Sequence, residues 1–456
     1  MSSPITINQA IEKSMFLLGA GFSYGTGCLT SVQMFTELRK MILNNEDTYF
    51  DATEKETLKF LISSLSYHSE WRTMEVSGEM DFSPNIEELA LLIRRIKSRE
   101  HIVPYPITGN WADKLVQLEA QYISSDNDKQ NNLFESLNLK LKLLLKDEWL
   151  KIDKETLGYL EPILNLLRST ADNPTSLDIY SLNNDVVIEE YFSDFNQQPF
   201  RGFHQGEWRG LDREQKESQF GRINLYKLHG SVDWIRLDDF SIWELGKVLT
   251  NHFEGNDEDF NEVIEASKNN PFIHYPYVIF GQGTKTFSID PFFSLINHFN
   301  ASLKGTEKEY IFVIGYSFFD PYINNLLFDA EKLGKKLIII NPNLGPTKLF
   351  QNFKVGEQSF YQPKWSGKDD FFEVEFTENC SLSDFVKYFK DIQKNSFYSE
   401  LPEFNNHNIT GVNTKYIPLT TAKFIEEFFK DEGSLFLKLI QEFEKEKEED
   451  LPFKDE

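Results

Sequence analysis

Cysteine is scarce in this chain: its 456 residues include only two, Cys28 and Cys380. Two cysteines allow at most one disulfide, so a disulfide framework is excluded, and so is a zinc site made of four cysteines. This usage is typical of a reducing compartment, and we expect a cytoplasmic protein.

Positive charge is scarce as well. The chain has 47 Lys and Arg residues against 72 Asp and Glu residues, which gives a formal net charge of -25 at pH 7. A strongly acidic chain repels nucleic acid and anionic membranes at long range, and no run rich in Lys and Arg offsets this repulsion. We therefore expect no direct binding of nucleic acid.

Long apolar runs are also missing. The longest, such as KKLIIINP at residues 335–342, have the length of a strand, whereas a membrane-spanning helix needs about 18 apolar residues. Residues 1–14, MSSPITINQAIEKS, have no basic segment followed by an apolar core, so we expect no signal peptide and no membrane association.

The sequence does have enough apolar material for a large core, with 40% hydrophobic and 14% aromatic residues. Short, nearly continuous apolar runs are typical of strands that are buried on both faces of a sheet. Helical patterns lie between several of these runs, which favours a parallel, doubly wound sheet. The strand-like runs are residues 14–23, 176–183, 222–230, 275–281, 308–317 and 335–343.

A long helical stretch separates the first strand-like run from the second. We predict an α/β fold, a Rossmann-like, doubly wound parallel sheet over residues 1–350 with a large helical insertion at about residues 32–170. Residues 351–456 form a small, mostly helical C-terminal segment, with a linker at 399–418 and two amphipathic helices after it. We expect this extension to serve oligomerisation or the docking of a partner.

Small or polar side chains close five of the strand-like runs. In an open parallel sheet, ligands bind beyond the carboxyl ends of the strands, so these residues are candidates for a site. Gly19, Ala20, Gly21, Phe22 and Ser23 close the first run, Asn183 and Asp185 the second, His229 and Gly230 the third, Ser317 the run at 308–317, and Asn341 the run at 335–343.

Each of these features alone has an ordinary structural explanation. Glycines permit tight turns, Asn and Asp favour turns, and a single His is commonly structural. Five strand ends with the same character, in an α/β order, favour a nucleotide site at this edge of the sheet. Asp320 fits an N-cap better than a ligand contact, while Asn85 and Glu87 either close over the site or are ordinary first-turn residues. His204 and His298 are expected to be structural.

Two common nucleotide signatures are absent. The glycines after Gly21 fall at Gly25 and Gly27, and no acidic residue ends a second strand about 20 positions later, which disfavours an ordinary NAD-dependent dehydrogenase. The motif Gly-x-x-x-x-Gly-Lys-Ser/Thr does not occur either, so a P-loop ATPase is excluded.

The motifs GAGFS, LNND, KLHG, VIGYS and INP, in this order over roughly residues 14–345, resemble the sirtuin (SIR2-like) superfamily. They are most similar to the SIR2-like NADases of bacterial anti-phage defence. Leu182 replaces the usual Thr or Gln of that pattern, and Asn184 replaces Tyr. The Cys-x-x-Cys pairs that hold zinc in protein-deacetylating sirtuins are absent, so the resemblance implies no zinc and argues against a deacylase.

The resemblance implies an NAD+ glycohydrolase that consumes NAD+ as a substrate and releases nicotinamide and ADP-ribose. It also implies a toxic effector that drains NAD+ during phage infection, is regulated by assembly into a homo-oligomer, and has a separately encoded ATPase, helicase-like or sensor partner. A nucleotide-binding sensor that has lost catalysis remains an alternative, because the motif around Asn183 is altered, and a protein deacylase is a weaker one.

The resemblance implies roles for the strand-end residues. Asn183 would orient water or a ribose hydroxyl, and His229 would act as the general base. The loop of residues 19–23 would hold the phosphates, and Gly230 would leave room for the ligand. Asp185 would bind the nicotinamide amide or stabilise the local turn. Ser317 and Asn341 would hold phosphate and the adenosine ribose.

Overall fold

The computed structural model describes most of the chain. The described residues are 5–44, 48–76, 84–97, 110–124, 132–170, 175–211, 223–252, 261–270, 272–280, 290–316, 320–342, 354–355, 358–359, 409–410, 414–417 and 419–449.

The centre of the molecule is a seven-stranded sheet with the order β12-β13-β9-β8-β1-β2-β5. The short edge strand β12 pairs antiparallel with β13, and every other pair is parallel. The strands are β1 (Ser14–Leu18), β2 (Leu177–Ser181), β5 (Ile223–Lys227), β8 (Tyr310–Ile314), β9 (Lys336–Ile340), β12 (Ile409–Thr410) and β13 (Thr414–Ile417).

The chain winds outward from the middle of this sheet in both directions. It runs from β1 through β2 to β5 on one side, then returns to β8, beside β1, and continues through β9 to β13. This is the doubly wound order of a Rossmann-like sheet, and the direction reverses between β1 and β8. The predicted α/β fold class is confirmed, and the reversal point is where such sheets bind their ligands.

Both faces of the sheet are covered, as the continuous apolar runs predict. Strands β1, β5 and β8 are buried at every position. In β1, Phe16 and Leu18 belong to one apolar cluster, while Met15 and Leu17 belong to another. Successive side chains of a strand point to opposite faces, so a strand buried on both sides needs apolar residues throughout.

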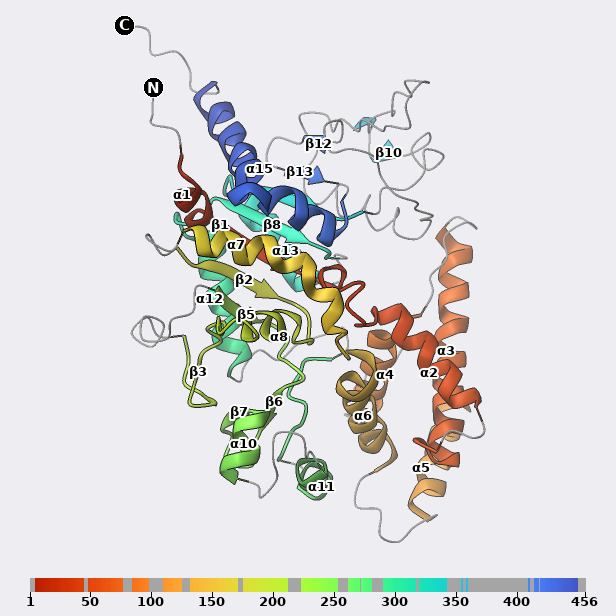
Figure 1. Cartoon of the computed structure of the whole chain (residues 1–456). Coiled ribbons are helices and arrows are strands. Elements are labelled where there is room, and N and C mark those ends of the chain that lie inside the picture. The colour runs from red at the N-terminus through yellow and green to blue at the C-terminus, as the bar shows by residue number, and fades with distance from the viewer. Residues whose placement is uncertain are drawn as a thin grey trace, which may run out of the picture.

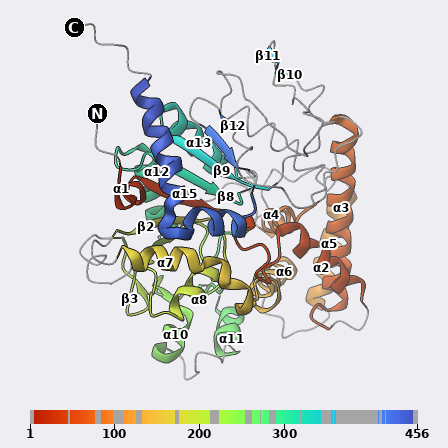
Figure 2. The same cartoon turned by 45° about the horizontal axis from the view of Figure 1, so that its top comes forward.

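Helices α1 (Ile7–Glu12), α7 (Glu161–Ser169), α8 (Val187–Ser193) and α15 (Thr421–Glu449) pack on the first face. Helices α12 (Phe292–Lys304) and α13 (Pro321–Lys332) pack on the other. Figure 1 and Figure 2 show α15 and α7 running side by side across the sheet. Helix α15 is interrupted by non-helical backbone at residues 430–433, so it consists of two helical segments, as the amphipathic pattern predicts.

The residues between β1 and β2 are mostly helical, and they form a block beside the carboxyl ends of the strands (Figure 1). The block contains α2 (Ser31–Leu43), α3 (Ala52–Val76), α4 (Ile86–Lys97), α5 (Asn110–Ser124) and α6 (Leu133–Leu144). The same stretch includes a π-helical turn at Leu145–Trp149 and a 3-10 helix at Lys154–Leu160, which follow α6.

A small antiparallel sheet extends from the β5 side, with the order β3-β4-β7-β6. It is followed by two helices. These elements are β3 (Phe203–His204), β4 (Glu207–Trp208), β6 (Trp234–Arg236), β7 (Ile242–Glu244), α10 (Leu245–His252) and α11 (Asn261–Asn269). A further hairpin joins β10 (Lys354–Val355) to β11 (Gln358–Ser359).

Two sequence predictions differ from the structure. Residues 275–280 do not form a strand of the main sheet; this segment makes only isolated bridges, from His274 to Arg236 and from Val278 to Gly230. Pro276 has no N–H to donate within it, which is unfavourable in a central strand. The second difference is the predicted linker at residues 399–418, which contains two strands, β12 and β13.

Strand β13 and helix α15 belong to the predicted C-terminal extension; β13 is a strand of the main sheet, and α15 packs on one face of that sheet. The division of the chain at residue 350 and the docking role of the extension stay predictions. No helix of the described residues is long and apolar enough to cross a membrane.

Candidate functional site

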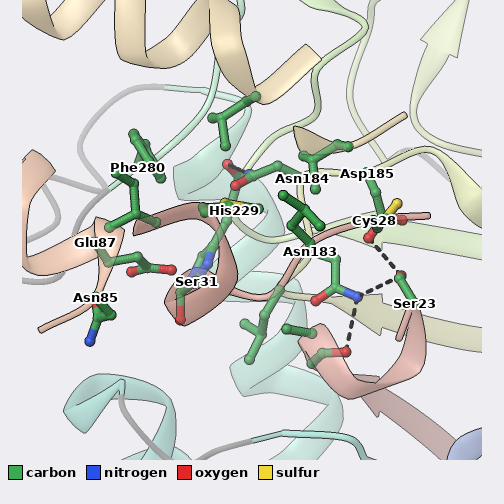
Figure 3. Close-up of a pocket in the computed structure, with 18 of the residues that line it drawn as sticks. Ser23, Cys28, Ser31, Asn85, Glu87, Asn183, Asn184, Asp185, His229 and Phe280 are labelled. Carbon is green, nitrogen blue, oxygen red and sulfur yellow. Dashed lines mark hydrogen bonds between the residues drawn. The ribbon is translucent and has the colours of Figure 1, made fainter. Parts of the chain in front are cut away.

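A pocket opens where the carboxyl ends of β1, β2 and β5 meet the helical block. Including the open solvent at its mouth, the pocket encloses about 1020 Å³ of space. Figure 3 shows side chains converging on it from both the sheet and the helices. Its polar lining includes Ser23, Glu87, Asn183, Asp185, His229 and Asp320.

The floor of the pocket is the crossing of two loops at the point where the winding reverses. The N–H of Gly19 donates to the carbonyl of Ile314 and the N–H of Gly21 donates to that of Gly315, both at 2.9 Å. A Cβ on Gly19 would lie 2.5 Å from the Cα of Tyr316, and a Cβ on Gly315, whose φ is +62°, would lie 2.5 Å from the carbonyl carbon of Gly21. These glycines are needed because two backbones touch here.

Backbone N–H groups that were expected to bind phosphate already form hydrogen bonds in and beside this crossing. The N–H groups of Gly19, Gly21 and Phe22 all donate to backbone carbonyls. Phosphate binding by the loop therefore stays a prediction, and it cannot rest on these three groups. The N-terminus of α2 also reaches the pocket, because its first residue, Ser31, is part of the lining.

Asn183 follows β2 and is held in one orientation. Its side-chain Nδ2 donates to the carbonyl of Gly19 at 2.9 Å and to the hydroxyl of Ser23 at 3.2 Å. With both amide hydrogens used in this way, the side-chain carbonyl oxygen is left as an acceptor. Figure 3 shows this oxygen pointing into the pocket. A carboxamide held like this can orient a water molecule or a hydroxyl group.

Asp185 is tied to the same loop. Its Oδ2 accepts from the Ser23 hydroxyl at 2.6 Å, and its Oδ1 accepts from the N–H of Val187 at 3.1 Å, at the start of α8. The buried ammonium of Lys227 donates to the backbone carbonyl of Asp185. Both carboxylate oxygens therefore already stabilise the turn, which was one of the two roles expected for this residue.

A buried charge network supports this turn from behind. The Lys227 ammonium lies 3.7 Å from Oε1 of Glu189, and Arg201 donates to Glu189 at 3.1 Å and to Asp233 at 2.7 Å. Burial raises the pKa of Glu189. Burial opposes ionisation of Asp233 as well, but the Arg201 guanidinium outweighs it and lowers the pKa of that carboxyl.

His229 follows β5 and faces the first turn of α13. Its Nε2 lies 3.3 Å from Oδ2 of Asp320, and its backbone carbonyl accepts from Nδ2 of Asn184 at 2.8 Å. Asp320 is also the N-cap of α13, because its Oδ1 accepts from the N–H of Tyr322 at 3.0 Å. The N-cap role is confirmed, and the same carboxylate has its second oxygen directed at the imidazole.

The helical block supplies the opposite wall. Asn85 caps α4, with its Oδ1 accepting from the N–H of Glu88 at 3.0 Å, and Glu87 lies in the first turn of the same helix. Figure 3 shows the Glu87 carboxylate directed toward Ser31 and His229, across the pocket from Asn183. First-turn residues of an inserted helix therefore take part in the lining.

The charge of the pocket is negative. Three carboxylates contribute to its lining, those of Glu87, Asp185 and Asp320, and no Lys or Arg is among its described lining residues. Apolar side chains, including Phe280, close the rest. A site of this kind favours a neutral or cationic group over a phosphate.

Comparison with solved structures gives several matches. One of them, a solved chain described as "Structural Basis for the Mechanism and Regulation of Sir2 Enzymes", is 13% identical, with a TM-score of 0.31, over 74% of this chain and 83% of that chain. No protein-family model and no curated protein matches the sequence. At this identity and TM-score the similarity identifies neither an activity nor a substrate, so function is argued from the site itself.

The structure brings six of the predicted site residues together in the pocket lining: Gly19, Ala20, Ser23, Asn183, Asp185 and His229. Gly21, Phe22, Gly230 and Asn341 lie outside that lining, and Ser317 lies outside the described residues. Their predicted contacts with a ligand stay predictions.

Neighbouring protein atoms surround three of these four residues. Gly230 has a φ of +78°, and a Cβ there would lie 2.3 Å from the carbonyl oxygen of Tyr277. A glycine at this position therefore allows the segment of residues 272–280 to pack closely against it. Phe22 is buried in the core, and Asn341 donates through Nδ2 to the carbonyl of Tyr316 at 3.4 Å.

Cys28 lines the pocket but is a poor nucleophile. Burial, and then the charge of Asp185, raises the pKa of its thiol to about 12, and the thiolate is the reactive form. Among the described residues no group of three or more His, Cys, Asp or Glu side chains is arranged to hold a metal ion. The expectation of a zinc-free protein stays a prediction, because part of the chain lies outside the described ranges.

Proposed function

We propose that the protein is an NAD+ glycohydrolase, which cleaves NAD+ to nicotinamide and ADP-ribose. The observation that carries this proposal is the convergence of a fixed carboxamide, an imidazole and three carboxylates in one pocket at the reversal point of a doubly wound sheet. Sheets of this kind bind nucleotides at that point.

The negative charge of the pocket fits the nicotinamide end of NAD+. The nicotinamide ring of NAD+ is cationic, and breaking its bond to C1′ of the ribose leaves oxocarbenium character on the sugar. Carboxylates that surround this carbon stabilise such charge as it develops, and more strongly where water is excluded. Glu87 and Asp320 would take this role, since both line the pocket.

The remaining residues fit the attack of water. The side-chain oxygen of Asn183, directed into the pocket, would accept a hydrogen bond from water and fix its position. As the water oxygen bonds to C1′, its proton passes to His229, and nicotinamide leaves with the electron pair of the broken bond. The Asp320 carboxylate, 3.3 Å from the imidazole, would stabilise the resulting imidazolium.

The biological setting is proposed on the sequence resemblance. An enzyme that drains NAD+ damages its own cell unless it is held inactive until a trigger arrives. We therefore propose a cytoplasmic effector of anti-phage defence that is regulated by homo-oligomeric assembly, or by a separately encoded ATPase or sensor partner.

The test follows nicotinamide release from NAD+ by the purified chain and by two variants. Asn183→Ala and His229→Ala should each lower the rate by about 100-fold or more, since each removes a group that positions or deprotonates water. His204→Ala, an exposed residue of β3, is the matched control and should leave the rate unchanged.

Release that survives both site substitutions would refute the assignment of these residues. NAD+ that binds without any release, including in the assembled or partner-bound protein, would instead favour the sensor alternative. Gel filtration of the same samples tests assembly, because a strict monomer under all conditions contradicts regulation by oligomerisation.

A further inference from the structure

Arg236, at the end of β6, is a buried cation that has no anionic partner in the described part of the chain. Arg236 is only 8% exposed, and its Nε atom is buried and has no hydrogen-bond partner among the described residues. Within the described ranges no carboxylate forms an ion pair with it. The guanidinium instead lies over the rings of Phe240 and Tyr277, with its Cζ 5.3 and 5.5 Å from their centroids.

Further positive charge gathers around this guanidinium. Lys142, on α6, is half-buried, and burial followed by the charges of Lys97, Arg94 and Arg236 lowers its pKa to about 8. Lys97 is paired with Glu135 at 2.7 Å. The Lys142 ammonium has no such carboxylate among the described residues, so it adds to the uncompensated charge.

The segment beside β6 adds a histidine to the cluster. The backbones of His274 and Arg236 exchange two hydrogen bonds, at 2.9 and 3.0 Å. Burial, and then the charges of Arg236, Lys142 and Lys97, lowers the pKa of His274 to about 3. The imidazole is therefore neutral at pH 7 and offers one N–H donor.

A cluster of this kind is unfavourable unless something neutralises it. Buried charges in proteins are normally paired with an opposite charge, and the contacts of Arg236 with two aromatic rings replace only part of the hydration that its guanidinium loses. The chain carries a net charge of -25, yet it places no carboxylate against Arg236 or Lys142 in the described part of the structure. The described residues therefore leave the positive charge of this cluster uncompensated, and an anion from solution would neutralise it.

We propose that Arg236, Lys142 and His274 form a binding site for the phosphate group of a small molecule, separate from the pocket that contains Asn183. A guanidinium, an ammonium and an imidazole N–H are the donors that bind phosphate oxygens most strongly. Lys142 is half-buried and Arg236 is buried, so Lys142 is the more exposed of these two cations. Phosphate free in solution and the phosphate of a nucleotide share this chemistry.

The site is distinct from the pocket. None of its three residues lines the pocket. The same elements do contribute to both, since Leu145, directly after α6, and Phe280, in the segment after His274, are pocket residues. On α4, Arg94 lies seven residues after Glu87, which is roughly 10 Å along the helix axis. Arg94, whose charge acts on Lys142, is thus about two helical turns away from Glu87, one of the pocket carboxylates.

The test is calorimetric titration and thermal unfolding of the full chain with inorganic phosphate, against chloride at equal ionic strength. Wild type should bind phosphate saturably and unfold at a higher temperature in its presence. Lys142→Met should weaken binding by about tenfold or more, because a charge-assisted bond is lost. Lys332→Met, an exposed lysine of α13, makes the same charge change elsewhere and should bind as wild type does.

AMP and ADP form the second arm of the titration. Binding of either one that depends on Lys142, without binding of inorganic phosphate, identifies a nucleotide as the source of the phosphate group. If phosphate and both nucleotides fail to bind, or bind equally well to the Lys142→Met variant, the proposal is overturned. Asn183→Ala should bind phosphate with the affinity of wild type. The phosphate site can therefore be tested separately from the proposed NAD+ glycohydrolase activity, and either proposal can fail without the other.

Discussion

Replacing Lys142 by methionine should stabilise the protein, although it removes a charged residue from a half-buried position. The Lys142 ammonium lies among Lys97, Arg94 and Arg236, and burial together with these charges lowers its pKa from 10.5 to about 8. A lowered pKa means that the folded state disfavours the charged form of the lysine. Methionine has a similar length and helix propensity and carries no charge.

The magnitude follows from the pKa. A fall from 10.5 to about 8 corresponds to about 3 kcal/mol of unfavourable free energy for the protonated lysine at pH 7. Because the side chain is only half-buried, solvent screens part of this, and a gain of about 1–2 kcal/mol in the free energy of unfolding is expected.

The pH dependence has a definite sign. Below pH 8 Lys142 is charged in both states, so the whole penalty is present. As the pH rises from about 8 to 10.5, the folded protein loses this proton before the unfolded chain does, and wild type gains stability. The advantage of Lys142→Met should therefore be complete at pH 7 and should shrink toward zero at pH 10.

Lys140, two residues earlier on the same helix, is the matched control with the opposite sign. Its ammonium lies 2.6 Å from Oε2 of Glu54, whose side chain is only 1% exposed. Lys140→Met would leave this buried carboxylate without its cation, with the Ser136 hydroxyl as a remaining donor at 2.7 Å. We expect Lys140→Met to lower the free energy of unfolding by about 3–5 kcal/mol.

The assay is urea unfolding at pH 7 and pH 10, in chloride buffer without phosphate, because a bound anion would remove the penalty on Lys142. The midpoint should rise for Lys142→Met and fall for Lys140→Met at pH 7. If Lys142→Met lowers the midpoint at pH 7, or if its gain persists at pH 10, the argument from uncompensated charge is wrong.

Two further predictions concern the loop crossing and the pocket thiol. Gly315→Ala should lower the free energy of unfolding by about 1–3 kcal/mol, because residue 315 has a φ of +62° and its Cβ would lie 2.5 Å from the backbone of Gly21. Gly158→Ala is the control, since its Cβ would meet no atom within 4 Å. Equal urea midpoints for the two variants would contradict this prediction. The Cys28 thiol should react with a disulfide reagent at pH 8 about 100-fold more slowly than in the unfolded chain, since its pKa is about 12. The second cysteine is replaced by serine for this measurement, and labelling at the rate of the unfolded chain would contradict it.

The main sheet was predictable because its strands leave a simple pattern. A strand buried on both faces must be apolar at nearly every position, and the runs of β1, β5 and β8 are. Strand β13 was missed because its four residues, TKYI, include polar ones and carry no such pattern. Residues 275–280 have the apolar pattern but lie beside the small sheet, since what a strand pairs with is decided by tertiary structure.

The same distinction applies to the site. Ser23, Asn183 and His229 were predictable as neighbours, because the carboxyl ends of parallel strands meet at one edge of a sheet. For Glu87 the sequence left two alternatives open, a residue that closes over the site or an ordinary first-turn residue. Phe280 was not predicted to line the site. Their positions depend on how the helical insertion and the segment of residues 272–280 pack against that edge, and no local pattern encodes this.

Net charge limited what the sequence could predict about ligands. A total of -25 describes the field far from the molecule, whereas a bound group responds to the few charges within about one Debye length. The pocket gathers carboxylates, while Arg236 and Lys142 meet in three dimensions from residues 94 positions apart in the chain. An acidic protein can thus offer a site for a cation and a site for an anion, and only the packing of α6 against the β6 region decides where the second one lies.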